Sequence, residues 1–434
     1  MSALAQRGLV VAPAKVGPDF IDPGYHSLAT GRPGRNLDAF LCGSHAIGPL
    51  AARASRGADV MVIEGVMGLF DGVGASSLAS TAHVAGLLQA PVVLVVDAAS
   101  LSASIAALVH GYDDHLRRLL GTGVAGLVLN RVGSPTHEAL LREALEPLEI
   151  PVLGALWRDP ALTIRQRHLG LVPVAEEPVA LARSITMLGS AIARALDLDA
   201  VVRIARQAPR VRTGELPRAA RVSAERVRIG VLGGPAFSFC YPENLERLEE
   251  AGAELVVVDP TASKRLPQEI HGLYACGGFP ELFAERLADN VPFLRDLRAR
   301  LAAGLPCWAE CGGMLLLVRS LDGRRLCGAL PADATLGDRV TVGYRSALVK
   351  EANPVAPAGS QLRGHEHHYS KIEPAGDALT LEGRSGTTSG GWASPTMLAS
   401  YLHLHLGADP TPAERFVATA ATRCSRALLQ AGQP

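Results

Sequence analysis

A cysteine followed by two glycines is the residue of this chain best placed to act as a nucleophile. Cys311 comes after the apolar run 305–308 and directly before Gly312 and Gly313. The pattern predicts a buried strand, a tight turn and a helix start, with the sulfur at a helix N-terminus whose amide dipoles favour a thiolate. The glycines permit the turn and leave the Gly312 N–H beside the sulfur, where an oxyanion needs a donor. The alternative is a buried structural cysteine next to a turn.

Two histidines near the C-terminal end favour the catalytic interpretation. His403 and His405 lie in the segment Tyr-Leu-His-Leu-His at positions 401–405. A cysteine paired with a histidine far away in the sequence is the arrangement of acyl-transfer enzymes, in which the imidazole holds and transfers the thiol proton. The sequence therefore predicts a cysteine-histidine acyl-transfer site.

A second group of chemically competent residues lies near the start of the chain. Lys15, Asp19 and Asp22 fall in the Gly/Pro-containing segment 15–26, which we expect to be a loop after a strand at 9–12. A lysine and two aspartates in such a loop suit contacts to phosphate and metal, although a solvated surface loop has the same composition.

Unbroken apolar runs predict further strands behind these residues. The runs 59–63, 91–96 and 124–129 alternate with helical patterns at 81–89 and 102–120. This alternation predicts a doubly wound parallel sheet, in which ligands bind at the carboxyl ends of the strands.

Polar residues follow these strands at the edge where a ligand is expected. Glu64 and Asp38 could hold a magnesium ion through oxygen ligands. Asp71 lies in the loop 64–72, and Asn130 could contact a nucleotide base. Each of these residues alone is more often a loop cap or a surface residue, and only the cluster favours a site.

Composition limits the possible partners. The chain has 434 residues, 48% of them hydrophobic, with 42 Lys plus Arg against 42 Asp plus Glu. The balanced charge gives no reason to expect nucleic acid or an anionic membrane surface as a partner. Seven cysteines without a CxxC pair, the lack of a signal peptide and the lack of a run of about 18 apolar residues predict a cytoplasmic protein without membrane attachment.

Two α/β domains joined by a linker account for the length. We expect the first domain at 1–207, an Arg- and Pro-rich linker at 208–226 and the second domain at 227–434. In the second domain, the glycine loop 277–281 follows a predicted strand at 272–276 and offers the Gly278 N–H as another oxyanion donor.

These motifs together resemble a known enzyme family. The second domain, with Gly-Gly-Phe-Pro-Glu at 277–281, Cys-Gly-Gly-Met at 311–314 and the segment 401–405, is similar to class I glutamine amidotransferase domains of the cobyric-acid-synthesis type. The first domain, with its motifs at 15–26 and 63–72, resembles ATP-dependent amide ligases related to dethiobiotin synthetase, a P-loop NTPase-like fold. The whole chain, including the motifs at 167–171 and 364–370, is similar to the cobyrinic or hydrogenobyrinic acid a,c-diamide synthases.

The resemblance implies a reaction and roles for the site residues. The expected activity is amidation of the a and c carboxylates of a corrinoid, with ATP, Mg²⁺ and L-glutamine, and with ammonia released at Cys311. His403 would be the base, His405 would stand where other members of the class have the orienting carboxylate, and Gly278 and Gly312 would supply the oxyanion donors. The resemblance further implies these roles in the first domain: Glu64 and Asp38 as metal ligands, Lys15 facing phosphate, Asp19, Asp22 and Asp71 near phosphate or substrate, and Asn130 on adenine.

The front of the chain departs from the family pattern. Family members begin with a strand and a glycine-rich phosphate loop ending in Gly-Lys-Thr, and this sequence contains neither Gly-Lys-Thr nor Gly-Lys-Ser. We therefore expect the true start to lie upstream, which a mass spectrum of the native N-terminus would test. If the loop is truly absent, the alternative functions are a glutaminase or a corrinoid-binding partner subunit; an ATPase of the partitioning type fits the fused glutaminase poorly. Base rates favour a homodimer, and the sequence leaves the presence of cobalt in the substrate open.

Overall fold

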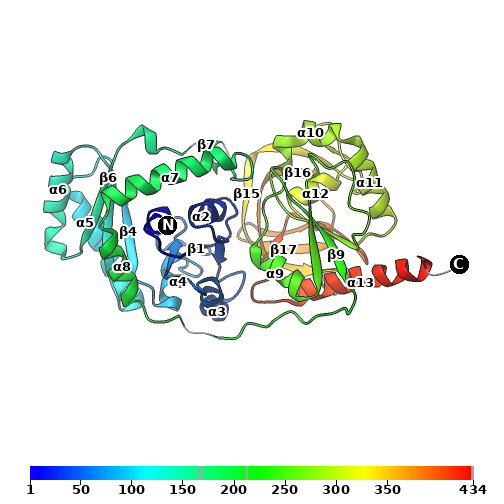
Figure 1. The fold of residues 1–434 in the computed structure, drawn as a ribbon, viewed down its shortest axis with the longest axis horizontal. Coiled ribbons are helices and arrows are strands. Elements are labelled where there is room, and N and C mark those ends of the chain that lie inside the picture. Colours follow the sequence, from blue (N-terminus) through cyan, green and yellow to red (C-terminus); the bar gives the residue numbers. More distant parts are fainter. Residues whose placement is uncertain (165, 168–169, 212–213, 432–434) are drawn as a thin grey trace. The chain divides into compact units, whose positions relative to one another are not determined.

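The computed structural model of the chain describes residues 1–164, 166–167, 170–211 and 214–431 (Figure 1). The chain divides into two compact units, Met1–Ala39 with Ser44–Gly214, and Phe40–Gly43 with Glu215–Pro434. The short segment Phe40–Gly43 therefore packs with the second unit. His168 and Leu169 of the motif at 167–171, and residues 212–213 of the predicted linker, lie outside the described residues.

The first unit alternates helices and strands, as its apolar periodicity predicts. Its helices are α1 (Ser2–Gln6), α2 (Asp22–Thr30), α3 (Ser44–Ala54), α4 (Thr81–Leu88), α5 (Ser104–Leu120), α6 (Pro135–Leu145), α7 (Pro178–Ala195) and α8 (Leu198–Gln207), with 3-10 turns at Glu146–Leu148 and Pro160–Leu162. Its strands are β1 (Val11–Val16), β2 (Arg35–Leu37), β3 (Val60–Glu64), β4 (Val92–Asp97), β5 (Val124–Val132), β6 (Val152–Trp157), β7 (Gln166–Arg167) and β8 (Gly170–Leu171).

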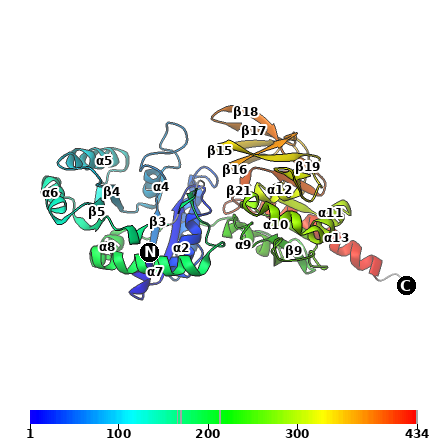
Figure 2. The ribbon, with the colours of Figure 1, turned by 90° about the horizontal axis from the view of Figure 1, so that it is seen from above.

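The parallel strands of this unit form two three-stranded sheets, β2-β1-β3 and β4-β5-β6. Figure 2 shows α5 on one face of the second sheet and α8 on the other. Among the described residues no strand joins β3 to β4, and Val95 of β4 is 59% exposed. The α/β fold class is confirmed, while the predicted single parallel sheet is divided in two.

The first strand and the loop after it differ from the prediction. The strand expected at 9–12 is β1, which continues to Val16, so Lys15 lies on a strand and not in a loop. Asp22 begins α2, with Pro23 in the first turn, where its missing N–H leaves no hydrogen bond unmade. The predicted loop at 15–26 is therefore only the turn at 17–21.

The second unit holds two sheets and five α-helices within its described residues. Its helices are α9 (Pro242–Glu250), α10 (Ala284–Asp289), α11 (Val291–Ala302), α12 (Gly312–Leu317) and α13 (Thr411–Ala431), with a 3-10 turn at Pro280–Phe283. Its strands are β9 (Val227–Leu232), β10 (Ala253–Val258), β11 (Gly272–Ala275), β12 (Cys307–Glu310), β13 (Ser320–Leu321), β14 (Arg324–Arg325), β15 (Asp333–Val349), β16 (Gln361–Glu373), β17 (Leu379–Gly383), β18 (Gly386–Gly390), β19 (Trp392–Ser394), β20 (Met397–Ser400) and β21 (His403–Leu404).

One sheet of this unit has the order β10-β9-β11-β12-β20-β19, with β19 antiparallel to β20 and the other neighbours parallel. The other has the order β14-β13-β15-β16-β21, with β17 on β15 and β18 on β17. In Figure 2, β15, β17 and β18 lie to one side of the layer that holds α12 and β9. Strand β12, which leads to Cys311, is thus an interior strand between β11 and β20.

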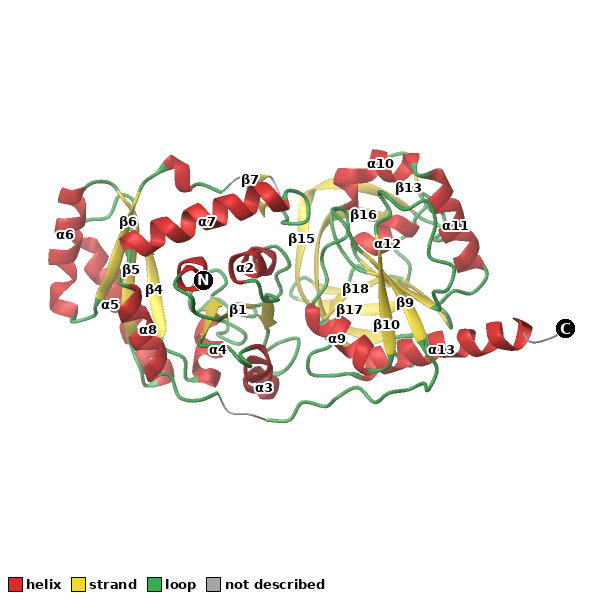
Figure 3. Ribbon diagram, viewed as in Figure 1, coloured by secondary structure: helices red, strands yellow, loops and turns green. Residues whose placement is uncertain are grey.

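The core of the second unit is built around a buried tryptophan. Trp308 of β12 is 1% exposed, and its ring lies 4.6 Å from that of Tyr274 and 6.0 Å from that of Phe416 on α13. Figure 3 shows α9 and α13 side by side below β9 and β10. Within the described ranges, no helix combines the length and apolarity needed to cross a membrane.

Candidate active sites

Cys311 occupies a strained turn between β12 and α12. Its backbone has φ 46° and ψ −106°, a left-handed conformation that a residue with a side chain adopts only under constraint. The constraint includes its N–H, which donates to the Ser400 carbonyl oxygen at 2.7 Å. Such strain concentrates at functional sites.

The two glycines after the cysteine are required by close packing. A Cβ on Gly312 would lie 2.8 Å from the Gly278 nitrogen, and a Cβ on Gly313 would lie 1.9 Å from the Ala275 carbonyl oxygen. The turn therefore presses against the end of β11 and the loop that follows it. The two predicted oxyanion donors, the N–H groups of Gly278 and Gly312, belong to backbone segments in direct contact.

His403 lies on β21, and its side chain is buried next to the cysteine turn. Strand β21 pairs with β16, with His403 opposite His365, and the two rings stack 5.0 Å apart. His403 is 1% exposed, and a Cβ on Gly277 would lie 2.3 Å from its Cε1 atom. The ring thus contacts the same glycine loop that contacts the Cys311 turn. The Cys311 thiol itself faces the His367 carbonyl oxygen, with sulfur and oxygen 3.8 Å apart.

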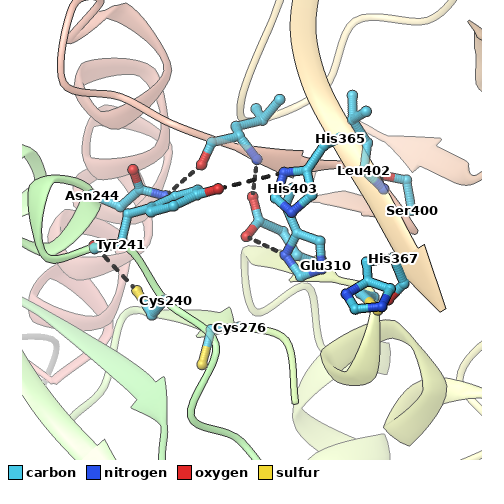
Figure 4. Close-up of polar contacts among 12 residues, drawn as sticks. Cys240, Tyr241, Asn244, Cys276, Glu310, His365, His367, Ser400, Leu402 and His403 are labelled. Carbon is cyan, nitrogen blue, oxygen red and sulfur yellow. Dashed lines mark hydrogen bonds and ion pairs between the residues drawn. The ribbon is translucent and has the colours of Figure 1, made fainter. Parts of the chain in front are cut away.

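A carboxylate that the sequence analysis did not select approaches His403. Glu310 Oε2 lies 3.7 Å from His403 Nδ1, an electrostatic contact longer than a hydrogen bond (Figure 4). The Tyr274 hydroxyl donates to Oε2 at 3.0 Å, and the Leu404 N–H donates to Oε1 at 3.1 Å. Because neighbouring residues on a strand point to opposite faces, a residue next to the nucleophile is not an obvious partner of its base. The sharp turn at Cys311 brings both to one site.

His405, the predicted third member of the catalytic group, has other contacts. Its Nδ1 atom lies 3.1 Å from the Cys42 sulfur and accepts the Gly407 N–H at 3.1 Å. Its Nε2 atom lies 3.7 Å from Glu243 Oε2, and its ring faces that of Tyr241. The contacts of His405 therefore join the segment Phe40–Gly43 to α9, and a role for it in catalysis stays a prediction.

The environment of Cys311 favours the neutral thiol over the expected thiolate. Burial raises the pKa of the thiol far above its ordinary value, and the Glu281 carboxylate raises this pKa further. A backbone hydrogen bond from Gly312 acts in the opposite direction but is outweighed. Burial also lowers the pKa of His365 far below its usual value, with a further contribution from His403, so His365 is a neutral imidazole. The thiol proton must consequently be transferred during the attack.

The first unit gathers three predicted carboxylates, Asp19, Asp22 and Glu64, around the buried Lys15. Lys15 is 5% exposed, and its Nζ atom lies 2.6 Å from Asp22 Oδ2 and 3.2 Å from Glu64 Oε1. Asp19 Oδ1 accepts the N–H groups of Ile21 and Asp22. The parallel register that pairs Lys15 with Glu64 brings the end of β1 against the end of β3.

His26 joins this cluster, although the sequence analysis did not select it. Its Nε2 atom lies 2.5 Å from Glu64 Oε2. Burial acts to raise the pKa of Glu64, but the hydrogen bond from His26 and the charge of Lys15 outweigh it and lower the pKa. Burial acts to lower the pKa of Lys15, but the bond to Asp22 and the nearby carboxylates outweigh it and raise the pKa. The lysine is therefore a fixed cation among carboxylates.

The remaining predicted residues of this unit lie on separate elements. Asp38 is fully buried directly after β2. Asp71 Oδ2 accepts the Gly68 N–H at 2.9 Å and so closes its own loop. Asn130 lies near the end of β5 in the other sheet, where its Oδ1 accepts the Arg131 N–H. The described contacts thus join Lys15, Asp19, Asp22 and Glu64, while the side chains of Asp71 and Asn130 accept hydrogen bonds from their own loop or strand.

The donor chemistry of this edge suits a magnesium ion that is shared with phosphate. No group of three or more His, Cys, Asp or Glu side chains suited to a metal occurs in the part of the chain that the structure describes. Asp38 and Glu64 follow β2 and end β3, on either side of β1, so their Cα atoms are separated by two strand spacings, roughly 10 Å. Magnesium often takes only one or two protein carboxylates and completes its shell with phosphate and water.

Family models match both parts of the chain. Residues 1–171 match the CobQ/CobB/MinD/ParA nucleotide binding domain, and residues 228–411 match the CobB/CobQ-like glutamine amidotransferase domain. With the cysteine elbow on one unit and the lysine-carboxylate cluster on the other, the protein is a glutamine amidotransferase that carries its own nucleotide-binding domain.

Relatives along almost the full length make the family specific. The hydrogenobyrinate a,c-diamide synthases of Streptomyces coelicolor and Thermobifida fusca are 43% and 45% identical, over 96% and 98% of this chain and 92% and 93% of those proteins. The cobyrinate a,c-diamide synthase of a Synechococcus strain is 39% identical over 96% of this chain and 93% of that protein. The chain belongs to the family of hydrogenobyrinate and cobyrinate a,c-diamide synthases. It is accordingly a ligase, and the expected fold and family are confirmed.

Proposed function

We propose that this enzyme converts the a and c carboxylates of hydrogenobyrinate or cobyrinate to amides. Each amidation would consume one glutamine, one water and one ATP, and would release glutamate, ADP and phosphate. The observation that carries the proposal is the likeness to named a,c-diamide synthases over 96–98% of the chain. Six free cysteines among the described residues agree with the reducing cytoplasm, and we propose a homodimer from base rates.

Glutamine hydrolysis would begin with the neutral thiol of Cys311. His403 would accept the thiol proton while the sulfur attacks the glutamine amide carbon. The N–H groups of Gly278 and Gly312 would stabilise the oxyanion, and Glu310 would stabilise the imidazolium. Collapse of the intermediate passes the proton to the leaving nitrogen and releases ammonia. Water then hydrolyses the thioester to glutamate.

The first unit would activate the corrinoid carboxylate. Lys15 would neutralise phosphate charge, and Asp38 and Glu64 would hold the Mg²⁺ that accompanies ATP. Asp19, Asp22 and Asp71 would lie near phosphate or substrate, and Asn130 would contact adenine. The carboxylate would attack the γ-phosphate of ATP, and ammonia would displace phosphate from the resulting acyl phosphate.

An amidation assay with purified protein tests the proposal. Hydrogenobyrinic and cobyrinic acid are offered separately, with Mg²⁺, ATP and either glutamine or ammonia, and products are identified by mass. We expect a corrinoid that has gained two amide groups, and the faster acid identifies the preferred substrate. Glutamine hydrolysis without an amidated product would refute the proposal in favour of a glutaminase.

A further inference from the structure

Glu281 is a partly buried residue whose 3-10 turn packs beside the nucleophile, and the mechanism above gives it no role. It lies in the 3-10 turn Pro280–Phe283, which packs on the cysteine elbow: a Cβ on Gly312 would lie 2.8 Å from Pro280 Cδ. Its Oε2 atom is buried, and no hydrogen-bond partner reaches this atom among the described residues. A carboxylate oxygen buried in this way is costly unless a ligand satisfies it.

The charged neighbour of Glu281 is negative, and the backbone N–H of Glu281 donates to its own carboxylate. The negative charge of Asp322 raises the pKa of Glu281, so this carboxylate has an acidic neighbour. The charge of Glu281 raises the pKa of the Cys311 thiol more than any other charged group does. It also raises the pKa of the Tyr401 hydroxyl. The Cys311 sulfur also faces the His367 carbonyl oxygen. This side of the nucleophile therefore attracts a cation that the described side chains do not supply.

We propose that Glu281 binds the α-ammonium group of the glutamine substrate and so selects glutamine among amides. The inference rests on the proposed glutaminase activity of Cys311. In glutamine, four single bonds separate the amide carbon from the α-nitrogen, a reach of about 4–5 Å. The turn that carries Glu281 packs on Gly312, directly after the nucleophile, so a glutamine with its amide carbon at the sulfur would bring its ammonium toward this carboxylate.

Binding in this manner also activates the nucleophile. The negative charge of Glu281 raises the pKa of the Cys311 thiol. An ammonium paired with Glu281 neutralises that charge and lowers the thiol pKa, so the proton moves to His403 more readily once glutamine is present. Glutamine thereby promotes its own hydrolysis.

Substitution of Glu281→Gln tests the proposal, because it keeps the shape and removes the charge. Glutamine hydrolysis is measured with glutamine and with glutaramate, which lacks the α-ammonium. We expect KM for glutamine to rise at least about tenfold with kcat changed less, and the preference of the wild type for glutamine over glutaramate to collapse. Exposed Glu285→Gln on α10 is the matched control and keeps the wild-type preference. A preserved preference in Glu281→Gln overturns the inference, whereas a wild type that hydrolyses no glutamine overturns the proposed function as well.

Covalent labelling of Cys311 separates substrate recognition from damage to the fold. A diazoketone analogue of glutamine carries the α-ammonium, and iodoacetamide does not. Glu281→Gln should slow labelling by the analogue, but should keep or increase labelling by iodoacetamide, because loss of the negative charge lowers the thiol pKa. Equal slowing by both reagents would indicate a structural defect and contradict the proposal.

The pH dependence of substrate binding supplies another readout. Burial raises the pKa of Glu281 to about 7, and only the ionised carboxylate pairs with the ammonium. The facing groups are Asp322, Cys311 and Tyr401, and neither the thiol nor the phenol, whose pKa values burial raises, ionises near pH 7. KM for glutamine should therefore rise as the pH falls through 7, and this rise should be absent in Glu281→Gln. A wild-type KM that stays constant across pH 6–8 would refute the assignment.

Discussion

Cys311 combines a strained backbone with a neutral, protonated thiol. Its left-handed φ of 46° costs on the order of 1–3 kcal/mol in a residue with a side chain. Burial and the nearby Glu281 keep the thiol protonated. The fold therefore fixes the position of the thiol, but the thiol needs a base to become nucleophilic.

The ionisation of this thiol predicts an unusual pH dependence of alkylation. Because the pKa of Cys311 is raised, the rate of iodoacetamide labelling in the enzyme without substrate should still increase above pH 8.5, near which a free cysteine is half ionised. Tandem mass spectrometry resolves Cys311 from Cys307, which shares its tryptic peptide. A labelling rate that levels off below pH 8 would show that the thiolate is already formed and would contradict the effect of burial.

Glu310 and His405 are competing candidates for the group that supports His403. Glu310→Gln removes the charge 3.7 Å from His403 Nδ1, so we expect kcat for glutamine hydrolysis to fall about 10²-fold with little change in KM. His405→Gln should have a smaller effect, because the contacts of His405 are to Cys42, Gly407, Glu243 and Tyr241. The reverse order of the two effects would identify His405 as the supporting residue.

At the scale of elements, the position of the nucleophile depends on how tightly α12 packs on the sheet. The helix begins at Gly312, after the interior strand β12 and Cys311, and its first residues meet the backbone at the end of β11. Because backbone atoms cannot rotate out of the way, this contact admits no side chain.

Gly313→Ala tests this packing. Its Cβ would meet the Ala275 carbonyl oxygen at 1.9 Å, so we expect a loss of at least about 1–3 kcal/mol in the free energy of unfolding of the second unit. Urea unfolding followed by tryptophan fluorescence measures the loss, because Trp308 lies in the core of this unit. Gly390→Ala is the control, since its Cβ has no neighbour closer than 3.7 Å. Equal stability of the two variants would contradict the argument.

The whole molecule places its two proposed chemistries on separate units. The cysteine elbow, its glycine loop and the histidines belong to the second unit, and the lysine-carboxylate cluster belongs to the first. Ammonia is the product of one reaction and the substrate of the other. A substitution that inactivates one unit should therefore leave the reaction of the other unit intact.

Paired variants test this division of labour. Cys311→Ser should abolish glutamine-dependent amidation, by at least about 10³-fold, while amidation supported by ammonia persists. Lys15→Met should reduce amidation from either nitrogen source at least about 10²-fold and leave glutamine hydrolysis measurable. Lys264→Met is the control for charge removal and should match the wild type. Loss of ammonia-supported amidation in Cys311→Ser would show that the cysteine also serves the synthetase reaction.

Local patterns in the sequence were sufficient for much of this architecture. Apolar runs predicted strands such as Val227–Leu232, and the Cys-Gly-Gly motif predicted the strand, turn and helix around Cys311, because these features depend on neighbouring residues. The extent of β1 was underestimated, since Pro13 and Lys15 are unusual in a buried strand and only pairing on both sides holds them there.

The sequence alone determined the α/β class, the family and the residue types available for chemistry. Only the tertiary structure decided which of these residues meet. Glu310, His26 and Glu281 acquire their significance from contacts with residues distant in sequence or from burial, and no local pattern encodes either. The same holds for the thiol of Cys311: the motif predicted a thiolate from the helix dipole, but burial outweighs a six-residue helix. Desolvation depends on the whole fold, which explains why the charge state of the nucleophile could not be predicted from its neighbours.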